Sequence, residues 1–328
     1  MRIAVDAMGG DNAPHEIVRG AVEGIAAVEG GELILIGDEN AVRAELARLT
    51  GWEGRVRIVH TTQVIGMDES PVEALRAKKD SSIVRMAVMA ADHSVDAVIS
   101  AGNTGACVAA CQLKMDTIRG VHRPGIAVVL PSFHGPLVVC DVGANIAPKP
   151  KHLHQYAIMA SLYAREVLGV SSPRVGLLSV GEEDAKGNSL VKKARECIRQ
   201  DSNLNFAGNV EGRDLFRGTV DVVICDGFVG NIVLKLTEGL AEGLFKTISA
   251  EIAAEVPHLA EDFKPVVRKV WTNHDYSEYG GAPLLGVDGI CIICHGSSDH
   301  RAIRNAVRVA FEFVKRRLNA VIADGLAK

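Results

Sequence analysis

The 328-residue sequence is poor in aromatic side chains, which make up 4% of its residues. Proteins that bind single-stranded nucleic acid without sequence preference stack the bases on aromatic side chains, so this scarcity argues against such a surface. The formal net charge is −4 and the isoelectric point is about 6.3, so no overall positive field attracts polyanions. We therefore expect no nucleic-acid partner.

Long apolar runs are also missing. The first run, Ile3-Ala4-Val5, stops at Asp6, so no signal-peptide core is predicted. Nowhere do 18 or more apolar residues follow one another, so no membrane-spanning helix is expected. The seven cysteines are an odd number scattered through apolar runs, which favours reduced, buried thiols. These features together predict a cytoplasmic protein.

The established cofactor and nucleophile motifs do not occur in this sequence. It contains neither G-x-G-x-x-G nor the G-x-x-x-x-G-K-[ST] loop of nucleotide-binding proteins. The G-x-S-x-G nucleophile motif and the H-E-x-x-H zinc motif are missing too. His152 and His154 stand two residues apart on an expected helix and therefore do not face each other, which argues against a metal pair there.

One string, Cys291-Ile-Ile-Cys294-His295, matches the attachment signature of a c-type haem. The surrounding residues also read as a buried strand followed by the polar loop HGSSD (295–299). Side chains alternate along a strand, so the two thiols would point to opposite faces of a sheet and could not share one haem or one zinc ion. We interpret the string as a core strand.

Ten short apolar runs alternate with longer stretches of helical periodicity. Runs that are apolar on both faces and separated by amphipathic helices predict an α/β protein whose sheet is covered on both sides. The short gap between 126–130 and 137–140 predicts one hairpin and hence a mixed sheet. No linker or repeat divides the chain, so residues 1–328 are expected to form a single unit. The runs are 2–5, 33–36, 56–59, 95–99, 126–130, 137–140, 174–180, 204–207, 220–225 and 290–294.

A long helix is expected after Asn231 and before Pro257. Its apolar residues recur at strict i+4 spacing, which we interpret as one stripe that belongs to the core or to a dimer face. The stripe consists of Leu236, Leu240, Leu244, Ile248, Ile252 and Val256.

Most apolar runs end in a polar loop rich in glycine and asparagine. In an α/β sheet, ligands bind at the carboxyl ends of strands and at the helix N-termini that follow them. Glycine lets backbone N–H groups approach a ligand, and a helix N-terminus favours an anion, so these loops suit phosphate or another oxyanion. Lys186 and Arg213 lie within two of the loops and carry the neutralising charge. The loops are 6–14, 100–106, 141–145, 181–188, 208–214, 226–231 and 295–299.

These motifs resemble, in order and over nearly the whole chain, the bacterial phosphate acyltransferases of phospholipid synthesis (acyl-acyl-carrier-protein:phosphate acyltransferases). The resemblance is carried by MRIAVDAMGGDNAP, KKDSS, SAGNTGA, DVGAN, GEEDAKGN, GNVEGRDLF, DGFVGN, YGGAPLLG and HGSSD. The apolar string CIIC departs from the version expected before HGSSD, but it lies in the predicted core.

The resemblance implies a three-layer α/β/α fold like that of isocitrate and isopropylmalate dehydrogenases, with one mixed sheet of about ten strands. It implies two intertwined halves and a protruding helical segment at about 232–270. It also implies a homodimer that associates peripherally with the inner membrane surface. The implied reaction transfers a long-chain acyl group from acyl-acyl-carrier-protein to inorganic phosphate, and a membrane glycerol-3-phosphate acyltransferase then uses the acyl phosphate.

Phosphate is itself the nucleophile in that reaction, which agrees with the missing nucleophile motifs. Lys186 is predicted to bind phosphate or stabilise the oxyanion, Asn231 to donate its amide to the oxyanion, and His295 to protonate the leaving thiolate, because its unperturbed pKa is near neutrality. Asp6, Asp141 and Asp226 are candidates for a base or for orienting their neighbours. The other predicted substrate- and phosphate-binding residues are Gly9, Gly10, Ser100, Asn103, Thr104, Asn145, Arg213, Ser297 and Ser298. The scheme requires no metal and no cofactor.

Three alternatives remain open at this point. Nicotinamide-linked 2-hydroxy-acid dehydrogenases share the implied fold and hold a divalent metal with aspartates. Phosphate acetyltransferases share it as well and use coenzyme A as the acyl carrier. A scaffold that binds the carrier protein at the membrane is the non-enzymatic alternative.

Two surfaces complete the predictions. Residues 188–200 read as a helix with Lys192, Arg195 and Arg199 on one face, which we predict to dock the acidic carrier protein. The turn at 256–259 exposes Val256 and Leu259 beside the cations Lys264, Arg268 and Lys269, which predicts a membrane contact.

Overall fold

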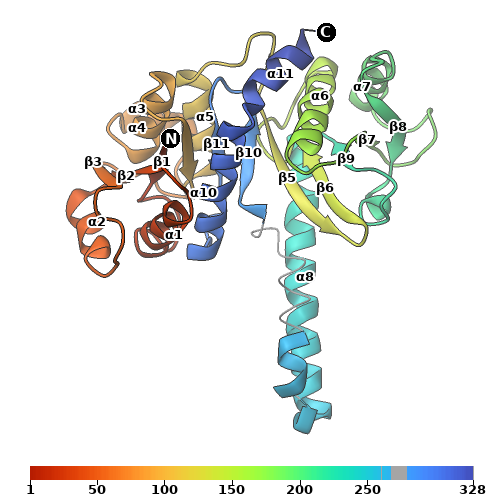
Figure 1. Cartoon of the computed structure of the whole chain (residues 1–328). Coiled ribbons are helices and arrows are strands. Elements are labelled where there is room, and N and C mark those ends of the chain that lie inside the picture. Colours follow the sequence, from red (N-terminus) through yellow and green to blue (C-terminus); the bar gives the residue numbers. More distant parts are fainter. Residues whose placement is uncertain (260, 267–278, 328) are drawn as a thin grey trace.

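The computed structural model describes residues 1–259, 261–266 and 279–327, and its strands form one sheet with helices on both sides (Figure 1). The sheet has eleven strands in the order β3-β2-β1-β4-β11-β10-β5-β6-β9-β7-β8. This architecture confirms the predicted α/β fold with a single mixed sheet.

Each of the ten apolar runs forms a strand. One strand of the described sheet, β10, was not predicted, and its residues lie inside the YGGAPLLG motif. The strands are β1 (Arg2–Asp6), β2 (Glu32–Gly37), β3 (Val56–His60), β4 (Ala97–Ser100), β5 (Gly125–Ser132), β6 (Gly135–Cys140), β7 (Arg174–Leu178), β8 (Asn205–Val210), β9 (Val222–Ile224), β10 (Ala282–Leu285) and β11 (Cys291–Ile293).

Strand direction reverses in the middle of the sheet. Strands β3, β2, β1, β4 and β11 are parallel. The β11–β10, β10–β5 and β5–β6 pairs are antiparallel, so the predicted hairpin is confirmed and β6 runs opposite to β11. Strands β9, β7 and β8 follow β6 in parallel. The polar loops that follow these strands therefore divide between the two edges of the sheet.

Two layers of helices cover the sheet. One core cluster joins the sheet to α1, α6, α7, α10 and α11, and the other joins it to α3, α4 and α5. The described helices are α1 (His15–Ala26), α2 (Glu39–Leu46), α3 (Pro71–Ala77), α4 (Ser82–Ala91), α5 (Thr104–Lys114), α6 (Pro150–Glu166), α7 (Ser189–Arg199), α8 (Gly227–Glu255), α10 (His300–Lys315) and α11 (Leu318–Leu326), with the short 3-10 turns η1 (Gly212–Asp214) and η2 (Pro257–Leu259).

The cysteine string lies in the core as predicted. Cys291 belongs to the cluster on one face of the sheet and Cys294 to the cluster on the other face. The two thiols therefore cannot share one haem or one metal ion, because the sheet separates them.

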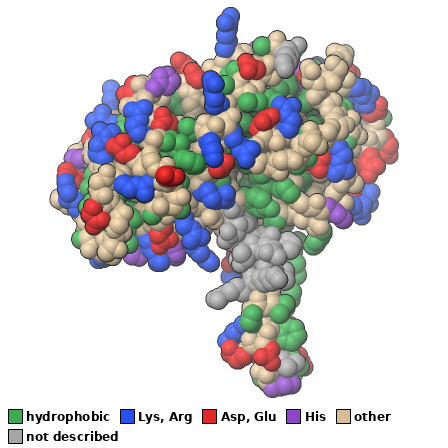
Figure 2. Space-filling view, viewed as in Figure 1, with side chains coloured by type: hydrophobic (Ala, Val, Ile, Leu, Met, Phe, Trp, Pro, Cys, Tyr) green, Lys and Arg blue, Asp and Glu red, His purple; other side chains and the backbone are tan. Residues whose placement is uncertain are grey.

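Helix α8 is 29 residues long and extends away from the body of the molecule (Figure 1). Among its residues, only Gly227 and Gly230 at its start are fully buried. Leu236, Leu240 and Leu244 are exposed in this chain, so the interpretation of the stripe as core is wrong for them. An α-helix advances 100° per residue, so i+4 spacing turns about 40° at each step and the stripe winds around the helix. Figure 2 shows hydrophobic side chains along this projecting helix.

Candidate functional site

Asp6 joins two loops at the carboxyl ends of β1 and β4. Its buried carboxylate accepts hydrogen bonds from the Ser100 hydroxyl (2.8 Å) and from the backbone N–H of Met8 (3.2 Å). Burial raises the pKa of Asp6, and hydrogen bonds from Ser82 and Ser100 oppose part of that shift. A Cβ on Gly9 would lie 2.5 Å from the same carboxylate, so glycine permits the close approach of the loop that also contains Gly10. Asp6 and Ser100 therefore hold these loops in place.

Asn103 serves the fold in a similar way. Its side-chain oxygen caps α5 by accepting from the N–H of Ala106, and its amide nitrogen donates to the backbone carbonyls of Gly66, Met67 and Glu69. These contacts occupy the amide that was predicted to bind phosphate. The neighbouring Thr104, in the first turn of α5, is exposed and open to a ligand.

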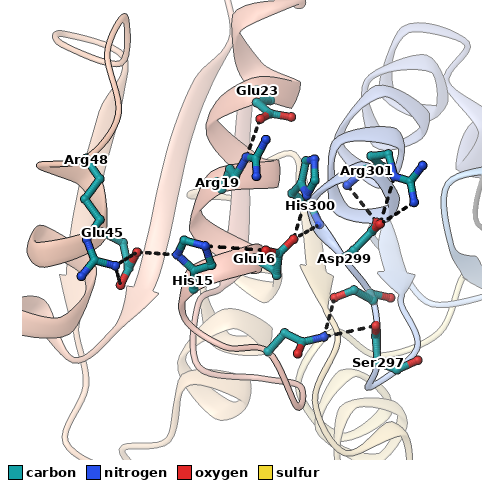
Figure 3. Close-up of polar contacts among 12 residues, drawn as sticks. His15, Glu16, Arg19, Glu23, Glu45, Arg48, Ser297, Asp299, His300 and Arg301 are labelled. Carbon is teal, nitrogen blue, oxygen red and sulfur yellow. Dashed lines mark hydrogen bonds and ion pairs between the residues drawn. The ribbon is translucent and has the colours of Figure 1, made fainter.

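The HGSSD loop packs against the loop that precedes α1. The Asn12 amide donates to the carbonyls of Ser297 and Ser298, and the N–H of Asp11 donates to the carbonyl of Gly296. Next to it, Glu16 accepts from the backbone and the ring of His300 at 2.7 and 2.8 Å (Figure 3). These contacts join α1 to the start of α10 and place Ser297 and Ser298 beside the groove described below.

His295 contacts a lysine that the sequence analysis did not select. The ammonium of Lys235 on α8 lies 2.6 Å from its Nε2 and 3.0 Å from the Glu238 carboxylate, while Nδ1 lies 2.8 Å from the Ser297 hydroxyl. Burial and the positive charge of Lys235 lower the pKa of His295, and Glu238 and Asp11 oppose the shift. A lowered pKa favours the neutral imidazole, which counts against the predicted role of His295 as a proton donor.

The sequence does indicate that Lys235 and Glu238 lie close together on one helix. They stand four and seven residues after Asn231, within the string NIVLKLTEG, and so on neighbouring turns of one helix. The spacing to His295, 60 residues away, gives no such information.

Asp141 and Asn145 stabilise the opposite edge of the sheet. The buried Asp141 carboxylate accepts from four backbone N–H groups, those of Ile126, Gly143, Ala144 and Asn145. Burial raises the pKa of Asp141, and these four hydrogen bonds oppose the rise. The Asn145 amide donates to the Pro124 carbonyl and to the Tyr156 hydroxyl. Both side chains are thus fully engaged within the fold.

Helix α8 begins at this edge and reaches the other group of loops. Asp226 caps it by accepting from the N–H of Val229. Asn231 is exposed one turn before Lys235. Gly230 packs against Asp141. Five residues later, about 7.5 Å along the helix axis, Lys235 contacts His295. The described contacts bring Lys235 to His295, and none brings Lys186 to either residue.

Lys186 is exposed in the loop before α7, and its ammonium forms no hydrogen bond or ion pair with any described residue. Two arginines of the following helix hold the loop, because Arg195 donates to the Asp184 carbonyl and Arg199 pairs with the Asp184 carboxylate at 2.7 Å.

The helix predicted at 188–200 is confirmed as α7, with Asn188 as its N-cap. Its basic face differs from the expectation, however. Arg195 is only 8% exposed and the exposed Arg199 is paired with Asp184, so Lys192 is the exposed cation of the three that has no described ion pair. Arg213, in another loop, pairs with Glu211 at 2.8 Å.

A groove of about 1800 Å³ runs along α8. Its lining is mostly apolar and includes Leu236, Leu240 and Leu244 of α8, with Leu215 and Phe216 after η1. Glu238, His295, Ser297, Ser298 and Arg301 also line it. The arrangement offers an apolar chain a long surface and offers a reacting group several polar partners.

Three buried thiols are the one set of described residues whose ligand atoms converge closely enough to share a metal ion: Cys107, Cys111 and Cys291. Their sulfurs lie 3.5 and 3.9 Å from one another, which is van der Waals packing within an apolar cluster. The aspartate cluster that a metal-dependent dehydrogenase requires is not found among the described residues.

Comparisons with known proteins come from sequence and from structure. The model of a family described as "Fatty acid synthesis protein" matches residues 1–321. A phosphate acyltransferase of Halothermothrix orenii is 47% identical over 100% of this chain and 99% of its own length. One of Pelotomaculum thermopropionicum is 50% identical over 97% of this chain and 93% of its own length.

Solved structures with the same fold are more distant in sequence. A phosphotransacetylase from Streptococcus pyogenes aligns with a TM-score of 0.65 at 17% identity, over 97% of this chain and 94% of that one. The EutD phosphotransacetylase from Staphylococcus aureus aligns with a TM-score of 0.62 at 14% identity, over 96% and 94%. At such low identity the likeness shows the fold alone.

Proposed function

The chain belongs to the phosphate acyltransferase family, and from this premise we propose that it transfers a long-chain acyl group from acyl-acyl-carrier-protein to inorganic phosphate. A phosphate oxygen attacks the thioester carbon, the carbon–sulfur bond breaks, and the proton of hydrogen phosphate passes to the thiolate. The products are an acyl phosphate and the free carrier thiol.

The groove along α8 is the observation that carries this proposal. Its volume of about 1800 Å³ exceeds the roughly 300–1000 Å³ of ordinary small-molecule pockets, and its walls are mostly apolar. An acetyl group would leave such a surface unfilled, whereas a long acyl chain would bury it. The thioester would then lie near the polar residues Glu238, His295 and Ser298.

The polar loops supply the rest of the reaction. Direct attack needs phosphate held against the thioester carbon and donors for the developing oxyanion. Ser297, Ser298 and the exposed Thr104 offer hydroxyls, and Lys186 and Asn231 remain predicted to contact phosphate and the oxyanion. Asp6, Asp141 and Asn103 act on the substrate only through the loops that they hold.

The test uses purified protein with palmitoyl-acyl-carrier-protein and inorganic phosphate. We expect release of free carrier that depends on phosphate, together with an acyl phosphate that hydroxylamine traps. Palmitoyl-coenzyme A and acetyl-coenzyme A serve as matched donors. Faster turnover of acetyl-coenzyme A would favour a phosphate acetyltransferase, and no phosphate-dependent turnover with any donor would favour a scaffold.

A dehydrogenase remains the other enzymatic alternative for this fold. It would change absorbance at 340 nm in the presence of a 2-hydroxy acid, NAD and a divalent metal ion. We expect no change, because Asp6 and Asp141 are occupied by hydrogen bonds within the fold.

The proposal includes two further associations. No described helix is long and apolar enough to cross a bilayer. We propose a peripheral contact with the inner membrane surface, where a glycerol-3-phosphate acyltransferase consumes the product.

We also propose a homodimer that covers Phe228 and Ile232, two exposed apolar residues at the base of α8 outside the groove lining. Light scattering should report twice the chain mass for the wild type and one chain mass for Phe228→Lys with Ile232→Lys. A wild-type protein of one chain mass would contradict it.

A further inference from the structure

Lys235 is held from two sides by residues that line the groove. Its ammonium contacts Nε2 of His295 at 2.6 Å and the Glu238 carboxylate at 3.0 Å. The His295 and Glu238 side chains both line the groove. An ammonium has three N–H donors, and among the described residues only two find acceptors. The third donor of Lys235 remains for a ligand.

The contacts also engage both ring nitrogens of His295. An ammonium cannot accept a hydrogen bond, so Nε2 of His295 accepts from Lys235, while Nδ1 lies 2.8 Å from the Ser297 hydroxyl and 3.3 Å from the Ser297 backbone N–H. Neither ring nitrogen is then free for substrate. His295 acts on the substrate only through Lys235 and Ser297.

Only one of the two carboxylate oxygens of Glu238 has a described hydrogen-bond partner. One oxygen accepts from Lys235, while the other, Oε1, is buried without a hydrogen-bond partner among the described residues. Leaving a buried polar atom unpaired costs about 1–3 kcal/mol or more. A fold tolerates such a cost where the group is retained for another purpose, here to hold the Lys235 ammonium.

We propose that Lys235 is a catalytic residue that binds the phosphate substrate and carries a proton to the leaving thiolate, with His295 and Glu238 as its positioning residues. This inference rests on the proposed function, since it assigns a residue to that reaction. A compact ammonium suits the task, because its charge can follow the negative charge from phosphate to the thioester oxygen and on to sulfur.

The proton balance closes without a further reactant. The phosphate oxygen forms its bond to the thioester carbon, and the electron pair of the carbon–sulfur bond leaves with sulfur. Lys235 donates its third N–H proton to that sulfur and recovers one from the phosphoryl hydroxyl. The ammonium is restored, and the products are acyl phosphate and thiol.

Activity measurements test the substrate role. Lys235→Met should lower kcat on the order of 10²-fold and raise KM for phosphate, while KM for the acyl carrier changes little. Lys114→Met, at an exposed lysine outside the groove lining, is the matched control and should behave as wild type. His295→Gln retains an acceptor for Lys235 and should keep more activity than His295→Phe.

A second measurement is independent of turnover. His295 is faced by Lys235 and Glu238 from α8 and by Asp11 from the loop after β1. Proton NMR titration, with the His295 signal assigned from its loss in His295→Gln, should show its pKa rising in Lys235→Met, because a positive charge is removed. The pKa should fall in Glu238→Gln, because a negative charge is removed.

The outcomes separate this inference from the proposed function. If the wild type shows no phosphate-dependent turnover but the His295 pKa moves in both directions, the contact stands and the proposed function fails. An active wild type with Lys235→Met above about a third of its rate, far from the ~10²-fold loss, overturns the inference. A His295 pKa that is unchanged in both variants overturns it as well.

Discussion

At the scale of single residues, hydrogen-bond partners separate the side chains that hold the loops from those that are open to substrate. Asp141 accepts from four backbone N–H groups, and Asn103 contacts three carbonyls and one N–H. Both stand in glycine-rich loops that the sequence marks as ligand sites. Lys186, in a loop of the same type, makes no such contact with the described residues.

The first prediction concerns Lys186. If it binds phosphate or the oxyanion, Lys186→Ala should lower phosphate-dependent turnover by roughly 10²-fold or more, comparable to the loss of an oxyanion donor. Its melting temperature should match that of the wild type, because the exposed ammonium has no described partner to lose. Steady-state kinetics and calorimetry measure the two quantities. A folded variant with more than about a third of normal turnover, far from the ~10²-fold loss, would end the assignment.

At the scale of secondary-structure elements, the contact of α8 with the sheet depends on one small residue. A Cβ on Gly230 would overlap the carbonyl oxygen of Asp141, whereas a Cβ on Gly239, farther along the same helix, meets nothing within 4 Å. Only glycine allows α8 to pack this closely and to carry Lys235 to His295.

The second prediction compares these two glycines. Gly230→Ala should lower the free energy of unfolding by about 1–3 kcal/mol, the usual cost of overpacking. Gly239→Ala should raise it by roughly 0.5–1 kcal/mol, because alanine favours the helical conformation. Urea unfolding of both variants measures the difference. Equal stability of the two variants would contradict the close packing at Gly230.

The third prediction concerns docking by α7. Lys192→Glu should raise KM for the acyl carrier and weaken its salt dependence, while kcat changes little, because an exposed charge acts mainly on encounter. Arg195 is unsuitable for this test, since it is buried and holds Asp184. Lys114→Glu is the matched charge reversal elsewhere on the surface. The docking proposal fails if KM for the carrier is the same in both variants.

At the scale of the whole molecule, α8 projects from the body and ends in η2, far from the sheet (Figure 1). The turn that we predict to contact the membrane lies at this tip. Val256 is half-buried there and Lys264 is exposed, whereas Arg268, Lys269 and the side chain of Leu259 lie outside the described residues.

The fourth prediction tests this tip. Val256→Asp with Leu259→Asp should reduce binding to vesicles that contain anionic lipid, because two carboxylates oppose insertion among the headgroups. Turnover of soluble acyl carrier should persist. Flotation of both proteins with the vesicles measures binding, and equal binding would refute the membrane contact.

The sequence by itself determined most elements and the family. Ten apolar runs became strands because a buried strand needs only a local run of apolar residues. The motif order also identified the family, which the comparisons confirm. Strand β10 was not predicted, because its four residues contain a proline and follow two glycines, which are local signals of a turn.

Only the tertiary structure decided how the polar loops group and which side chains are free. The reversal of direction at β10, β5 and β6 depends on pairings between distant segments, and it divides the loops between two edges of the sheet. The lowered pKa of His295 depends on burial and on Lys235, 60 residues away. Local sequence encodes propensity, whereas hydrogen-bond partners and electric fields arise only once the chain has folded.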